Sequence, residues 1–142
     1  MAAAAALYSP QVLALATGLA AFPPDTALPL KGQARSPACG STLTMHLSID
    51  AAGRIDRIGL RAHACAIGQA SAAIFASAAP GQTAKDIATA LSGIERWLKG
   101  EGELPDWPGL EAVAAARAYP ARHGAMLLPW KAAVAALSST QS

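Results

Sequence analysis

The chain is poor in aromatic residues and in clustered charge. Only 5% of its 142 residues are aromatic, so the core must be mainly aliphatic, with Trp97, Trp107 and Trp130 as its few large side chains. Eleven Lys and Arg residues against nine Asp and Glu give a formal net charge of +2, and no long run of either sign occurs. Nucleic-acid binding calls for a clustered basic face, and the sequence shows none, so we expect no nucleic-acid partner.

Long apolar segments are also missing. The apolar run at residues 12–22 is shorter than the ~20 residues that span a bilayer, and it ends at Pro23-Pro24. Residues 1–6 are nearly all alanine and lack the basic start of a secretory signal. We therefore expect a cytoplasmic protein with no membrane partner. In such a reducing compartment, two cysteines more often serve metal or redox chemistry than a disulfide.

The length and the order of the expected elements indicate one α+β domain over residues 1–142, with flexible ends at 1–6 and 138–142. Residues 42–49 alternate apolar and polar side chains, the period of a half-buried antiparallel strand. A turn at 50–53 leads to a second strand at 54–61, and a shorter strand is expected at 27–34. These segments predict a three-stranded antiparallel sheet with helices packed on one face.

Helix signals surround the strands. Ser9-Pro10 is a typical helix start, and Thr83-x-x-Asp86 is a weaker one for a helix that runs to about residue 99. Further helices are expected at 66–79, at 110–118 and at 122–137, the last with Pro129 inside it as a kink or a late start.

Two cysteines are the main candidates for chemistry. Cys39 lies in the turn-like stretch Ser36-Pro37-Ala38-Cys39-Gly40-Ser41, and Cys65 lies where a strand pattern changes to a helix pattern. A helix start offers free backbone N–H groups and a positive dipole end, both of which stabilise a thiolate. Two thiolates on neighbouring loops suit zinc or an iron–sulfur cluster. The alternative is that both cysteines are buried and behave as small hydrophobic residues.

The three histidines are weaker candidates. His46 lies on the polar face of the expected strand, where a solvated side chain is the simplest interpretation. His63 precedes Cys65 by two residues and faces either the same loop or the surface. His123, at the start of the last helix, either completes a tetrahedral site with two thiolates or caps the helix. A Cys–His nucleophile would need an orienting partner, which the sequence does not supply, and there is no Gly-rich phosphate loop, so we expect no enzymatic activity.

The sequence around both cysteines resembles that of the IscU/SufU/NifU N-terminal family of iron–sulfur cluster assembly scaffolds. That family has Pro-x-Cys-Gly-Asp in a loop and, later, a cysteine followed by a small-residue helix, here Cys65 with Ala70-Ser71-Ala72. The likeness runs from about residue 7 to 137. It favours the SufU branch because of Tyr119-Pro120-Ala121-Arg122 and Trp130-Lys131-Ala132, and because the Leu-Pro-Pro-Val-Lys motif of the IscU branch is missing.

The resemblance implies a scaffold that binds iron, a nascent cluster or zinc. It also implies a cysteine desulfurase and recipient apo-proteins as partners. The family uses three cysteines and an aspartate; Cys39 and Cys65 match two of them, whereas Ser41 stands at the aspartate position and Ala125 at the third cysteine. The alternative is therefore a metal-free relative that acts as a protein-interaction module in cluster assembly.

The missing ligands suggest two arrangements. In a mononuclear site, His123 would replace the thiolate missing at Ala125, with Ser41, His63 or water in the fourth position. In a homodimer, a bridged cluster would need only two thiolates from each chain.

Overall fold

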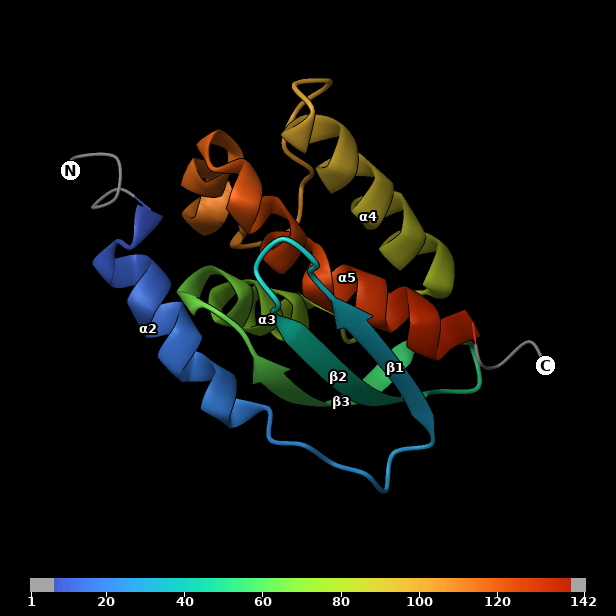
Figure 1. Cartoon of the computed structure of the whole chain (residues 1–142). Coiled ribbons are helices and arrows are strands. Elements are labelled where there is room, and N and C mark those ends of the chain that lie inside the picture. The colour runs from blue at the N-terminus through green and yellow to red at the C-terminus, as the bar shows by residue number, and fades with distance from the viewer. Residues whose placement is uncertain (1–6, 139–142) are drawn as a thin grey trace.

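The computed structural model describes residues 7–138 and shows a single α+β domain (Figure 1). The expected flexible ends lie outside these residues, except for Ser138, which is the last residue of helix α5. Within residues 7–138, no helix combines the length and the apolar character needed to cross a bilayer.

Three strands form one antiparallel sheet in the order β1-β2-β3: β1 (Leu30–Arg35), β2 (Thr42–Ile49) and β3 (Ile55–His63). The alternation in β2 is confirmed, because Leu43, Met45 and Leu47 are buried while the residues between them are half-exposed. Ile49 is only half-buried, because a bulge at Ser48/Ile49 shifts the register there. The first strand lies a few residues later than expected, and the third continues two residues past its expected end.

The helices cover the inner face of the sheet (Figure 1). Helix α3 (Ala66–Ala78) and helix α5 (His123–Ser138) pack against the strands, α2 (Pro10–Gly18) packs against α3, and α4 (Ala84–Leu98) packs against α5. Three further segments are 3₁₀ helices: η1 (Leu19–Ala21), η2 (Leu110–Ala118) and η3 (Pro120–Arg122). The helix expected at 110–118 is therefore 3₁₀, and the last α-helix begins at residue 123.

The expected caps are present. Ser9 Oγ accepts from Val12 N at 3.2 Å at the start of α2. Thr83 and Asp86 form a full capping box on α4, with both side chain-to-backbone bonds made. Pro129 does not end α5, since this helix is buried along most of its length and packing offsets the hydrogen bond that proline removes.

Three of the seven aromatic residues form one cluster within the core. Phe75 stacks on Trp107 with ring centroids 5.3 Å apart, and Trp130 meets both rings edge-on at 5.5 and 5.4 Å. The Trp107 indole donates to the carbonyl of Ile74 at 3.1 Å. Trp97 is also buried, so the expectation that the three tryptophans are large core residues is confirmed.

A glycine allows α5 to approach the edge strand closely. Gly32 faces inward on β1, where a Cβ atom would collide with the backbone of Ala132 and lie 2.5 Å from the backbone nitrogen of Ala136. This close approach holds the C-terminal half of α5 against β1.

Candidate thiol site

Cys39 lies in a tight turn that joins β1 to β2. The turn closes through Ser36 N to Ser41 O and Gly40 N to Ser36 O, both at 2.8 Å. Gly40 has a φ of +74°, which favours glycine at this position. The turn leaves the Cys39 side chain half-buried beside two buried serines.

Two hydroxyls surround the Cys39 sulfur. Its Sγ lies 3.1 Å from Ser41 Oγ and 3.4 Å from Ser36 Oγ. When the sulfur is a thiolate, both hydroxyls can donate to it. These bonds, from Ser36 first and then Ser41, lower the pKa of Cys39 below its usual value, and the charge of Arg122 contributes in the same direction. Ser41 thus contacts the sulfur from the position at which the family carries aspartate.

Cys65 is the N-cap residue of α3, which confirms the expected strand-to-helix switch. Its backbone is extended, its carbonyl accepts from Gln69 N at 3.0 Å, and its thiol makes no capping hydrogen bond. The side chain of Gln69 closes the same turn by donating to Ala64 O at 2.8 Å. The Cys65 side chain is half-buried, and its thiol does not cap the helix.

Arg122 connects the two cysteines. It ends η3, and its Nε donates to the Tyr8 hydroxyl at 3.2 Å. This hydrogen bond is the main cause that raises the pKa of Arg122, and the thiols of Cys65 and Cys39 raise it further. Both thiols therefore lie within electrostatic range of one guanidinium, that of Arg122.

The first turn of α5 closes the site from behind. A Cβ atom on Gly124 would collide with the Ser36 hydroxyl, so this turn lies directly against the Cys39 turn. Ala125 is fully buried, and its Cβ would lie 3.6 Å from a Cβ on Gly68, in the first turn of the helix that Cys65 caps. The position at which the family carries its third cysteine thus lies between the two cysteine segments.

In the part of the chain that the structure describes, no histidine is grouped with both thiols. His123 Nε2 lies 2.8 Å from the carbonyl oxygen of Arg117, which directs the imidazole toward η2. His63 is exposed on β3 opposite Thr42, and His46 lies further along the same outer face of the sheet. Among residues 7–138, no three His, Cys, Asp or Glu side chains are grouped so that they could hold a metal ion. The structure therefore does not assemble the Cys39–Cys65–His123 site that the sequence suggested.

The residues that the sequence analysis missed are Arg122, Tyr8 and Ser36. Arg122 was noted only as part of the Tyr-Pro-Ala-Arg stretch, and Tyr8 directly precedes the Ser9-Pro10 helix start without a signal of its own. No local pattern reveals a hydrogen bond between residues 114 positions apart. The buried Ser36 offered a weak signal, because it flanks the cysteine turn.

This geometry defines a class: a small α+β domain with two free thiols on adjoining turns at one end of a three-stranded sheet, and one arginine whose charge reaches both thiols. The family model for the NifU-like N-terminal domain matches residues 22–124. The chain belongs to this family, as its two cysteine motifs predicted.

Solved structures agree with this assignment. A NifU-like protein (N-terminal) from Brucella abortus is 26% identical, with a TM-score of 0.89 over 98% of this chain and 97% of that one. A protein described as an iron–sulfur cluster assembly scaffold for the SUF system, FiSufU from Fervidobacterium islandicum AW-1, is 21% identical, with a TM-score of 0.81 over 94% of this chain and 98% of that one. No curated protein sequence matches the chain.

Proposed function

We propose that this protein is an iron–sulfur cluster assembly scaffold whose cargo, iron or a nascent cluster, is held by the thiolates of Cys39 and Cys65. The observation that supports the proposal is that Cys39 and Cys65 are free thiols on adjoining turns, because the paired residues Thr42 and His63 bring both turns to the same end of the sheet. Soft sulfur ligands are those that iron–sulfur clusters use. The protein acts as a carrier and not as an enzyme, with a cysteine desulfurase as sulfur donor and apo-proteins as recipients.

The ligand count favours a shared cargo. A [2Fe–2S] or [4Fe–4S] cluster takes four cysteine ligands, and each chain offers two. Two copies of the chain, or one chain and a partner, therefore complete the set. A structural zinc ion has the same requirement, because such sites are four-coordinate and closed.

Arg122 fits this role because it offsets charge. Two thiolates at one site repel each other, and a guanidinium beside both of them favours their ionised forms. Where the family carries a further carboxylate and a third thiolate, this chain has Ser41 and Ala125 and so carries less negative charge. This difference supports weaker, more readily released binding of a cationic cargo.

The second candidate is a metal-free interaction module of the cluster assembly machinery. The observation that favours it is that no group of three potential ligands exists among residues 7–138.

One experiment separates the two candidates. The purified protein is reconstituted anaerobically with iron and sulfide, and its visible absorption, its iron content and its molecular mass in solution are measured. A scaffold with two ligands per chain should give a chromophore and about four thiols per cluster, hence two chains per cluster. Cys39→Ser and Cys65→Ser should each abolish the chromophore, while His46→Ala should not. If the wild type binds no iron, the metal-free module remains.

A further inference from the structure

The outer face of the sheet, turned away from α3 and α5, gathers the cations that are dispersed in the sequence. The pairing of the strands sets which side chains share this face. We define the outer face as the following residues: Lys31, Gln33, Arg35, Thr42, Thr44, His46, Ser48, Arg57, Gly59, Arg61 and His63. The expectation that the chain has no clustered basic face was therefore wrong, because spacings of two and four residues along strands do not form a charge run.

The outer face carries positive charges that no acidic side chain among the described residues neutralises by an ion pair. Four of its side chains are permanent cations, and each of these four is exposed: Lys31, Arg35, Arg57 and Arg61. Within residues 7–138, none of the four side chains makes an ion pair or a hydrogen bond. The segment of residues 23–25 covers the face at Gly59, where a Cβ atom would meet the backbone of Pro23 and Asp25. The acidic residues near the face are Asp25, in this segment, and Asp56, which is exposed near the start of β3. The centre of the face is lined by hydroxyls, with Gln33 donating to Thr44 at 3.5 Å.

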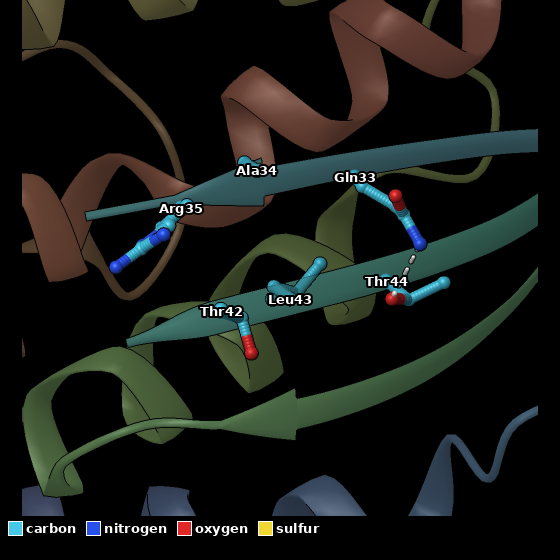
Figure 2. Close-up of a pocket in the computed structure, with 6 residues that line it drawn as sticks. All are labelled: Gln33, Ala34, Arg35, Thr42, Leu43 and Thr44. Carbon is cyan, nitrogen blue, oxygen red and sulfur yellow. Dashed lines mark hydrogen bonds between the residues drawn. The ribbon is translucent and has the colours of Figure 1, made fainter. Parts of the chain in front are cut away.

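The face is continuous with the thiol site. Its last cross-strand row is Arg35, Thr42 and His63. The next residues along these strands are Ser36 and Ser41, which surround the Cys39 sulfur, and the segment that ends at Cys65. Figure 2 shows Arg35 and Thr42 at this end of the sheet, beside the shallow hollow between β1 and β2. A macromolecule seated on the face would therefore reach the thiols.

We propose that the outer face is the docking surface for an acidic protein surface that is brought against the thiol site. Unpaired cations around a flat polar surface are complementary to carboxylates and raise the rate of encounter with a partner of opposite charge. A protein is favoured over nucleic acid because the face has no aromatic side chain on which bases could stack. The proposal does not depend on the cargo of Cys39 and Cys65, because neither cysteine belongs to the face.

The test uses fluorescein-labelled poly-L-glutamate as the acidic probe, and fluorescence anisotropy at low ionic strength as the readout. We expect binding that weakens as salt is added, since exposed charges are screened. Arg35→Gln/Arg61→Gln should weaken binding by roughly 3- to 10-fold, since each exposed ion pair is worth about 0.2–1 kcal/mol. The matched control is Arg96→Gln/Lys99→Gln, which removes the same charge from two exposed positions, one in the last turn of α4 and one at its C-cap, and should change binding by less than about 2-fold.

Two further measurements fix the location of the docking surface and separate this proposal from the cluster-binding function. Carbodiimide coupling should join the probe to the Lys31 amine more efficiently than to Lys99. Cys39→Ser/Cys65→Ser should bind the probe as the wild type does, even though it would lose any cluster.

Several outcomes would overturn the proposal. These are absence of probe binding, an equal loss in the α4 control, or loss of probe binding when the cysteines are replaced. Tighter binding of a single-stranded DNA oligonucleotide with the same number of charges would overturn it in favour of a nucleic-acid partner.

Discussion

Arg122 Nε donates to the hydroxyl of Tyr8 at 3.2 Å, across 114 positions of the chain. Tyr8 precedes α2, and Arg122 ends η3, so this bond joins the N-terminal helix to the segment that leads into α5. The other N–H groups of the guanidinium make no hydrogen bond within residues 7–138 and remain available to the two thiols. The Tyr8–Arg122 pair is therefore the element that positions positive charge at the site.

Removing this charge should make Cys39 less reactive. In a Cys65→Ser background, Arg122→Gln should raise the pKa of Cys39 and shift the pH midpoint of its alkylation by iodoacetamide upward. Tyr8→Phe should shift it in the same direction by less, because the guanidinium remains. Arg96→Gln on α4 serves as control. An unchanged midpoint in Arg122→Gln would show that the guanidinium does not act on the thiol.

The two serine hydroxyls should matter more than the arginine. They are the leading causes of the lowered pKa of Cys39, so Ser36→Ala and Ser41→Ala should each raise the alkylation midpoint further than Arg122→Gln does.

The lowered pKa of Cys39 should also make the free energy of unfolding depend on pH. In the unfolded chain the Cys39 thiol has its usual pKa of 9.0, and in the folded chain this pKa is lower. At a pH between these two values, the thiol of the unfolded chain therefore holds more protons than that of the folded chain. The stability of the wild type relative to Cys39→Ala should therefore rise with pH across this window, and this advantage should be lost as the pH falls through the folded pKa. Urea unfolding over a pH series measures it.

The sheet and most helices could be predicted because their signals are local. The period of two at residues 42–49 set the inward residues of β2, and the Thr83–Asp86 pair marked the start of α4. What failed depended on tertiary context: η2 is a 3₁₀ helix although its composition suits an α-helix. The helix expected at 122–137 does contain Pro129, and its burial explains why the proline is tolerated. The basic outer face was missed for a similar reason, since only the strand register brings Lys31 and Arg61 to one side.

The site was predicted in part. The two cysteine segments were recognised from their neighbours, and Ser41 does contact the Cys39 sulfur. The proposed role of His123 rested on its distance along the chain from Ala125, which does not fix the direction of a side chain. The carbonyl of Arg117, near the end of η2, offered the imidazole a hydrogen-bond partner that sequence spacing could not show.

The close contact between β1 and α5 should not tolerate a methyl group. Gly32→Ala should lower the free energy of unfolding by about 1–3 kcal/mol or more, because the new Cβ meets the backbone of Ala132 and not a movable side chain. Gly18→Ala is the matched control: no atom lies within 4 Å of the position that its Cβ would take, and alanine favours the helix, so this change should be neutral or stabilising by up to about 1 kcal/mol. Denaturant unfolding measures both, and equal values would contradict the contact.

His123 should matter for folding and not for cargo. His123→Ala removes the bond to the Arg117 carbonyl and should lower the free energy of unfolding by about 0.5–1.5 kcal/mol. The chromophore obtained with iron and sulfide should be unchanged, as it should be in His63→Ala. A loss of iron in His123→Ala alone would restore the three-ligand site that the sequence suggested.

Ser41 and Ala125 stand at the two positions where the family carries further ligands. Ser41 already contacts the Cys39 sulfur, and Ala125 lies beside Gly68, in the first turn of the helix that Cys65 caps. Ser41→Asp/Ala125→Cys should therefore create a four-ligand set within one chain, and the variant should bind one zinc ion per monomer. Metal content after dialysis and zinc titration with a chromogenic chelator measure this.

The wild type and each single variant should bind zinc more weakly than the double variant, because a closed tetrahedral site needs all four ligands. Ser41→Asn/Ala125→Ser, which keeps the sizes but removes the charge and the sulfur, is the control for packing. If the double variant folds and still binds no zinc, the two thiols do not lie in one site with residues 41 and 125, and the cluster-binding proposal loses its geometric basis. If the wild type binds zinc as tightly as the double variant, ligands outside this set must complete its site.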